Sequence, residues 1–179
     1  MSGRKQVFDT KRLALTAMLL ALCVMFQCLK SLSVYLTCSA VNAILVLATL
    51  YCGLAGGLCI AVLAPVAAAL LGATPIINMI PLMIVVIAAG NAVLVVLAAL
   101  LKRKLVVGLV FGSVGKAAFL WLLVWYVMLP VFGGNIPEAM QAAMRVTFSV
   151  TQLVTAAIGS AIACLIHWRI AAARTAKDN

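Results

Sequence analysis

Residues 80–129 read IPLMIVVIAAGNAVLVVLAALLKRKLVVGLVFGSVGKAAFLWLLVWYVML, which is two apolar runs on either side of the basic triplet Lys102-Arg103-Lys104. An α-helix needs about 20 apolar residues to cross the hydrocarbon core of a bilayer, and each run is long enough. The triplet is too costly to place in hydrocarbon, so it marks a turn between two spans. This stretch therefore predicts an all-α membrane protein.

The composition of the whole chain supports the same fold class. Of its 179 residues, 67% are hydrophobic and 9% are charged, whereas soluble domains are about half apolar and about a quarter charged. That apolar fraction is enough for about six spans of about 20 residues each, with no room for a soluble catalytic domain. We expect a six-transmembrane-helix bundle that forms a single membrane domain, residues 1–179. Its expected helices are 13–29, 36–50, 56–71, 79–101, 105–129 and 146–168.

Several local signals refine this pattern. The first apolar run is expected to be a retained helix and not a signal peptide, because it is long and no small-residue cleavage site follows it. A turn is expected at Tyr51–Gly57, and Pro65 is expected to kink the third span where neighbouring helices satisfy the freed backbone. Glu138–Met144 has the pattern of a short amphipathic piece, and the polar tail Arg169–Asn179 is expected to fray.

The basic residues are distributed unevenly between the two sides that six spans define. The chain has 13 Lys and Arg against 3 Asp and Glu, a net charge of +10. Because short cytoplasmic loops hold the excess of Lys and Arg, we expect both termini in the cytoplasm. The charge is interpreted as a topology signal and not as a nucleic-acid surface. The side of the termini holds Arg4, Lys5, Lys11, Arg12, Lys102, Arg103, Lys104, Arg169, Arg174 and Lys177, and the other side holds Lys30 and Arg145.

The polar residues of the chain do not form the pattern of an enzyme active site. His167 is the single histidine, and Asp9, Glu138 and Asp178 are far apart in the sequence. No paired metal motif is formed by the six cysteines, which are interpreted as apolar filler. The chain also lacks a phosphate-binding loop and the sequence motifs of zinc proteases and serine esterases. We therefore expect no metal, no cofactor and no catalytic activity.

Lys116 is the most informative residue, because it is near the middle of the fifth predicted helix. A cation at that depth costs several kcal/mol unless it is paired or hydrated, so it must face protein or water. One interpretation is a structural lysine satisfied by carbonyls or by Asn91. The other is a pocket cation that binds an anionic or carbonyl group of a ligand. Small residues at helical spacing around it would let a neighbour approach closely, namely Gly108, Gly112 and Gly115.

Further polar and aromatic residues are expected toward the outer side. Asn78 is in the loop before the fourth helix, and Gln27 is near the outer end of the first. Trp121 and its neighbours form either an interfacial belt or a surface that stacks on a ligand. On the sixth helix, a polar stripe either bonds to other helices or lines a pocket, with Glu138 as an ion-pair candidate for Arg145. The stripe consists of Arg145, Ser149, Gln152, Thr155 and Gly159.

The chain resembles the substrate-binding S components of energy-coupling factor (ECF) vitamin transporters. The resemblance covers nearly the whole chain and rests on six helices, on the opening TKRLALTAMLLAL at residues 10–22 and on FSVTQLVTAAIG at residues 148–159. Ala17 and Ala21 match the family's A-x-x-x-A motif on the first helix. Two small residues one turn apart form a flat face against which another helix can pack.

The resemblance implies a high-affinity subunit of an ECF-type ABC importer in the bacterial cell membrane, which captures a water-soluble vitamin or related micronutrient from outside. It also implies docking through Ala17 and Ala21 onto an ECF transmembrane scaffold subunit, with two cytoplasmic ATPase subunits. The ligand is expected toward the outer face, among helices four to six and the loops between helices one and two and three and four. The candidate ligand-binding residues are Asn78, Asn91, Lys116, Trp121, Arg145, Ser149 and Gln152.

A second hypothesis is a small membrane scaffold or assembly protein without a solute, in which Lys116 and Gln152 act as internal glue. The first hypothesis predicts ligand binding and dependence on partner ATPases. If it holds, the cations Lys116 and Arg145 favour a small hydrophilic solute with a carboxylate or several carbonyl acceptors. A ring of that solute would stack on Trp121 or Trp125.

Overall fold

The computed structural model describes residues 10–29 and 33–178, and every regular element in this part of the chain is helical. The long helices are α1 (Thr10–Cys28), α2 (Val34–Leu70), α4 (Met83–Leu100), α5 (Leu105–Leu123) and α8 (Val150–Asp178). The short ones are α3 (Pro75–Met79), η1 (Lys102–Lys104), the π-helical turn η2 (Val124–Met128), α6 (Leu129–Phe132), η3 (Gly133–Asn135) and α7 (Glu138–Thr147). The predicted all-α class is confirmed. Arg4, Lys5, Asp9 and Lys30 lie outside the described residues.

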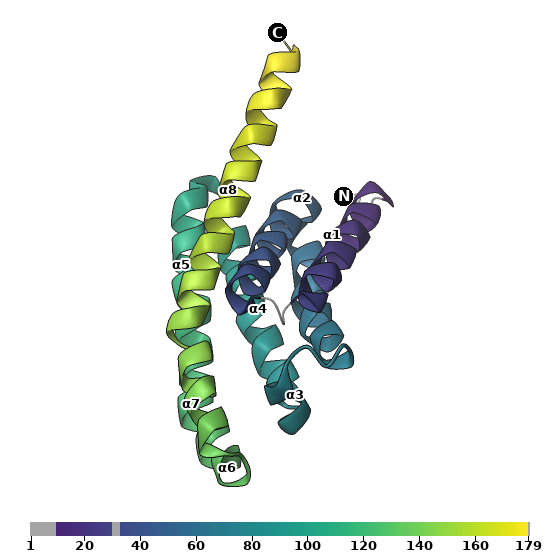
Figure 1. Ribbon diagram of the computed structural model, residues 1–179. Helices are drawn as coiled ribbons and strands as arrows, with labels where there is room; N and C mark the ends of the chain where they lie inside the picture. Colours follow the sequence, from purple (N-terminus) through teal and green to yellow (C-terminus); the bar gives the residue numbers. More distant parts are fainter. Residues whose placement is uncertain (1–9, 30–32, 179) are drawn as a thin grey trace, which may run out of the picture.

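The 37-residue helix α2 reverses direction at Gly53, where φ is 82°. A glycine tolerates this left-handed value because it has no Cβ. The Thr37 hydroxyl donates to the carbonyl of Phe26, and the Gln27 amide donates to that of Ala64. In a straight helix Thr37 and Ala64 would be about 40 Å apart and could not both contact the same end of α1. We call residues 34–52 the first arm and residues 54–70 the second arm (Figure 1).

The reversal gives the bundle six crossings. Five helical segments are long and apolar enough to span a bilayer, and α2 is one of them. Each arm of α2 is about 25 to 28 Å long, close to the thickness of the hydrocarbon core. The turn predicted at Tyr51–Gly57 is thus present, but it is reduced to one non-helical residue.

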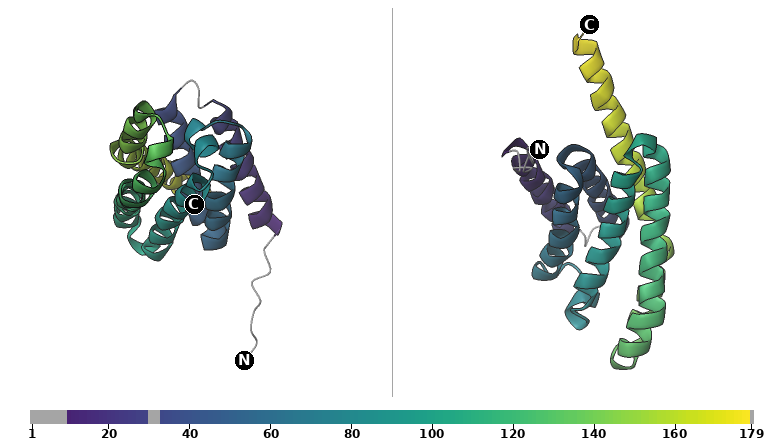
Figure 2. Two further views of the ribbon diagram at one scale, coloured as in Figure 1. Left: turned by 90° about the horizontal axis from the view of Figure 1, so that it is seen from below. Right: turned by 180° about the vertical axis from the view of Figure 1, so that it is seen from behind.

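The turns divide between the two ends of the bundle (Figures 1 and 2). One end, which we call the basic end, holds the start of α1, the reversal of α2, the Lys102–Lys104 turn and the C-terminal part of α8. The opposite end holds α3 and the turn formed by α6 and η3. The start of the first helix and the end of the last helix therefore lie at the basic end, as an even number of crossings requires.

The outer segments differ from the predicted boundaries for identifiable reasons. The fourth span begins at Met83 and not at residue 79, because Pro81 disfavours a helical conformation at Ile80, which has φ −130° and ψ 88° after the short α3. The predicted amphipathic piece is present as α7, and a break at Phe148–Ser149 separates it from α8.

The expectation of a frayed C-terminal tail is wrong. Helix α8 does not end at residue 168 but continues to Asp178 and projects past the other helices at the basic end (Figure 1). Its last turns contain Ala171–Ala173, and alanine is the strongest helix former. Arg174 adds a cation near the helix C-terminus, where it complements the macrodipole.

Two apolar clusters form the core, and a polar layer separates them. The cluster nearer the basic end contains Leu94 of α4 and Leu109 of α5, whereas the other contains Val86 of α4 and Leu120 of α5. Between them, α4 carries Asn91 and α5 carries Lys116.

Close contacts between helices at two glycines hold this layer together. A Cβ on Gly112 would meet Leu94 at 2.9 Å, which confirms the expected close approach of a neighbour to α5, and one on Gly159 would meet the backbone oxygen of Ser39 at 2.5 Å.

Candidate functional site

Lys116 is held in the polar layer by two amide oxygens. Its Nζ donates to Oδ1 of Asn42 at 2.5 Å and to Oδ1 of Asn91 at 2.7 Å. The three side chains come from α5, the first arm of α2 and α4, and each is at least 97% buried. The cation is therefore solvated by protein amides, as the depth of Lys116 requires.

Pro65 explains why Asn91 presents its oxygen to the lysine. Proline has no N–H, so the carbonyl of Ala61, four residues earlier, lacks its intrahelical donor. The Nδ2 of Asn91 donates to that carbonyl at 3.3 Å, and Oδ1 is left to accept from Lys116. The second arm keeps helical dihedrals at Pro65, since Gly53 is the residue of α2 that departs from them. A neighbouring helix thus satisfies the backbone group freed by Pro65, as predicted.

No carboxylate among the described residues neutralises Lys116. Glu138, at the start of α7, forms no salt bridge with it, and the partners of its Nζ are the oxygens of Asn42 and Asn91. An ammonium group has three N–H donors, and two of them are used by the asparagines. The ammonium form of Lys116 thus has one donor that the asparagines do not use, and the residue also lines a cavity.

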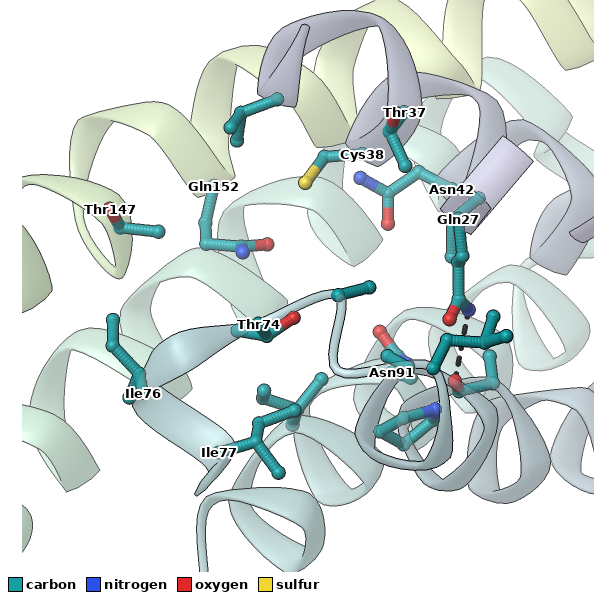
Figure 3. A pocket seen from close by; sticks show the side chains of 18 of the residues that line it. Gln27, Thr37, Cys38, Asn42, Thr74, Ile76, Ile77, Asn91, Thr147 and Gln152 are labelled. Atoms are coloured by element: carbon teal, nitrogen blue, oxygen red, sulfur yellow. Dashed lines mark hydrogen bonds between the residues drawn. The ribbon is translucent and has the colours of Figure 1, made fainter. Parts of the chain in front are cut away.

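The cavity has a volume of about 820 Å³, and its lining includes Lys116 and residues 71–77, which precede or belong to α3. Figure 3 shows part of this lining from close by. Its walls come from the end of α1, both arms of α2, residues 71–77, α4 and the α7–α8 junction. Pockets for small ligands have volumes of about 300 to 1,000 Å³ and place a few polar groups on a largely apolar wall. The polar and thiol side chains that line this one are Gln27, Cys28, Thr37, Cys38, Asn42, Thr74, Asn91, Lys116, Thr147 and Gln152.

Three of the seven predicted ligand-binding residues line this cavity, and four lie elsewhere. Asn91, Lys116 and Gln152 are brought together, whereas Asn78 is exposed on α3. Arg145 and Ser149 are also outside it, because the helix break at Phe148–Ser149 takes them off the face that carries Gln152. The cavity lining thus lacks four of the residues that were expected to share a pocket, namely Asn78, Trp121, Arg145 and Ser149.

The polar stripe of the sixth span has separate roles along its length. Gln152 lines the cavity, while the Thr155 hydroxyl donates back to the carbonyl of Thr151 at 2.8 Å. Gly159 lets α8 approach the first arm of α2. Ser149 donates to the carbonyl of Arg145 at 2.5 Å. The stripe therefore combines one cavity residue with positions that serve packing.

Arg145 interacts with an aromatic cluster and not with Glu138. Its guanidinium carbon lies 4.9 Å from the ring centroid of Trp125, a cation–π arrangement. Trp121 contacts the rings of Trp125 and Tyr126, with centroids 6.2 and 6.0 Å apart. Arg145 and Glu138 are both described, and no salt bridge joins them. The rings are exposed on the bundle surface, which favours an interfacial belt over stacking on a ligand in the cavity.

Two amides that shape the site were not among the predicted site residues. Asn42 is a lone amide in the apolar run of the first arm, and that pattern by itself could have identified it. Gln27 was expected near the outer end of α1, yet its contact with Ala64 joins residues 37 positions apart. Sequence spacing gives no sign of such a contact.

The face of α1 that carries Ala17 and Ala21 is open. Both alanines are exposed, and Met18 beside them is 69% exposed. Thr16, Cys23 and Gln27 are the buried residues of this helix. An apolar helix face without an intramolecular neighbour lies against lipid or a partner helix.

Comparison with known proteins identifies one family. The family model described as "ECF transporter, substrate-specific component" matches residues 11–172, about nine tenths of the chain. No curated protein and no solved structure gives a match.

Proposed function

The chain belongs to the family of substrate-specific components of ECF transporters, and from this premise we propose that the cavity above Lys116 holds its solute. Members of this family are substrate-binding subunits of transporters and not enzymes. They work in a complex with other ECF components. The proposal concerns where the solute lies, what chemistry it has and how the chain faces the membrane.

The observation that carries the proposal is the positive charge of Lys116 on the cavity wall. Two asparagine oxygens hold the ammonium, and no carboxylate in the described part of the chain offsets its charge. A buried cation without a counter-charge is costly, so a solute that brings an acceptor gains from meeting it. We infer a small hydrophilic solute with a carboxylate or carbonyl acceptor, in the class of water-soluble vitamins and related micronutrients. Asn91 and Gln152 contribute further polar contacts.

The scaffold hypothesis accounts for less of the geometry. It explains the hydrogen bonds between Lys116 and the two asparagines as internal glue. It gives no reason for a cavity of about 820 Å³ that ends at the same cation, because helix packing without a ligand favours filled interiors. The family match also favours a solute-binding subunit.

We expect at least one solute from a defined panel to stabilise the purified protein against heat. The panel is thiamine, riboflavin, nicotinamide, nicotinate, pantothenate, pyridoxine, biotin, folate and uracil. A ligand present at a hundred times its Kd adds about 2.7 kcal/mol to the free energy of unfolding by mass action. The measurement is the unfolding temperature in detergent, followed by calorimetric titration of each solute that raises it. No increase and no binding heat with any of them would contradict a vitamin-class ligand and favour the scaffold hypothesis.

We also propose that the basic end faces the cytoplasm of a bacterial cell, because positive loops are retained there. A cysteine at Gly134, in η3 at the opposite end, should then react with an impermeant maleimide in intact cells. The background would be a variant without the native cysteines. The matched control is Thr175→Cys on the projecting part of α8, which should react only after permeabilisation. The reverse pattern would overturn the orientation.

A further inference from the structure

We propose that Gln27 is a second contact for the solute, at which its amide oxygen accepts a hydrogen bond from an N–H or O–H group of the ligand. The inference rests on the proposed function. Lys116 requires an acceptor on the solute, and the present inference requires that the solute also carry a donor. The residue that contacts this donor lies on α1.

The buried amide of Gln27 is satisfied on one side only. The residue is 95% buried, and its Nε2 donates to the carbonyl of Ala64 at 2.9 Å and to Sγ of Cys23 at 3.6 Å. Its Oε1 is buried and has no hydrogen-bond partner in the described part of the chain. Leaving a buried acceptor without a donor is destabilising, so an atom of this kind requires an explanation.

The orientation of this amide is fixed by its neighbours. If the oxygen and nitrogen exchanged places, the oxygen would lie 2.9 Å from the carbonyl oxygen of Ala64, and two acceptors would face each other. Gln27 therefore presents an oxygen, which accepts hydrogen bonds and cannot donate them. Gln27 lines the cavity, and Figure 3 shows its oxygen on the cavity side of the amide.

A second buried atom without a partner provides an internal comparison. The hydroxyl oxygen of Ser39 also lacks a hydrogen-bond partner in the described residues. Ser39 does not line the cavity, and it lies where Gly159 brings α8 against the first arm. Each of the two residues thus has a buried polar atom without a partner in the described part of the chain, and only Gln27 also lines the cavity.

The two contacts together restrict the chemistry of the solute. Lys116 offers only donors, and the Gln27 oxygen is only an acceptor. A ligand that satisfies both carries a carbonyl or carboxylate and, elsewhere, an N–H or O–H group, as an amide or a ring lactam does. A solute whose only polar groups are ionised carboxylates leaves Gln27 unsatisfied.

The test combines a change in the protein with a change in the probe. The probe is whichever panel solute binds the unmodified protein most tightly, compared by calorimetry with analogues in which each N–H or O–H is methylated singly. Nicotinamide and uracil are panel members for which such analogues are simple. We expect methylation at one position to weaken binding about tenfold, and this loss to fall to about twofold in Gln27→Met. Ser39→Ala is the matched control and should keep the tenfold loss.

Each outcome bears on the inference. If every methylated analogue binds unmodified protein within about twofold of its parent, the contact does not exist; this arm needs no variant and holds even if Gln27→Met fails to fold. An equal methylation loss in the unmodified protein and in folded Gln27→Met would also overturn it, since the methylated group would then contact a residue other than Gln27. Absence of binding by any panel solute would contradict the proposed function itself, and with it this inference.

Discussion

Replacing Lys116 with methionine should weaken binding of the panel solute by about ten- to a hundredfold, the equivalent of about 1.5 to 3 kcal/mol for a charge-assisted hydrogen bond. Methionine keeps most of the apolar length and removes the ammonium. The substitution also leaves the oxygens of Asn42 and Asn91 without their donor, so the unliganded protein should unfold at a lower temperature. Kd by calorimetry and unfolding temperature without ligand are therefore measured on the same preparation.

A substitution at Ser113 distinguishes a loss of affinity for the solute from a loss of stability. Ser113 lies one turn before Lys116 on α5, is buried and pairs with Ser160 at 3.0 Å. Neither serine lines the cavity. Ser113→Ala should therefore lower stability by about 1 kcal/mol and leave Kd unchanged. If folded Lys116→Met also leaves Kd unchanged, the lysine is a structural group and the argument for an acceptor-bearing solute fails.

The fold was predictable because its main determinants are local. A run of about 20 apolar residues identifies a span by length alone, and a basic triplet identifies a turn by its desolvation cost. Gly53 marks the reversal of α2 in the same way, since it lies among signals of a turn. The break at Phe148–Ser149 was not predicted, because no proline or glycine marks it.

The candidate site was predictable only in part, because it is formed by contacts between distant segments. Lys116 and Asn91 were identified because they are polar residues near the middle of apolar spans. This signal can be recognised within a single helix. The role of Pro65 depends on Asn91, 26 positions later, reaching the carbonyl of Ala61. Arg145 was placed in the pocket because a continuous helix was assumed, and the helix break turns it onto Trp125.

Replacing Ala17 and Ala21 together with leucine should abolish solute uptake while leaving solute binding nearly unchanged. Both alanines are exposed, and Ala17 lies toward the basic end of α1, whereas the cavity begins at Gln27, more than one helical turn beyond Ala21. At about 100° per residue, they are also turned about 100 to 140° around the helix from Thr16 on its buried side. Two added isobutyl groups would prevent close packing of a partner helix without entering the protein core.

The same spacing elsewhere in the chain supplies a matched control for this prediction. Ala157 and Ala161 are also four residues apart and exposed, but they lie on α8. Their replacement with leucine adds the same volume to the membrane-facing surface and should preserve uptake by cells that contain the complete transporter. Uptake lost in both double variants would indicate a general effect of bulk in the membrane. Loss of binding in Ala17→Leu/Ala21→Leu would mean that docking and solute sites are not separate, because a change on the open face of α1 would have altered the cavity at the far end of the same helix.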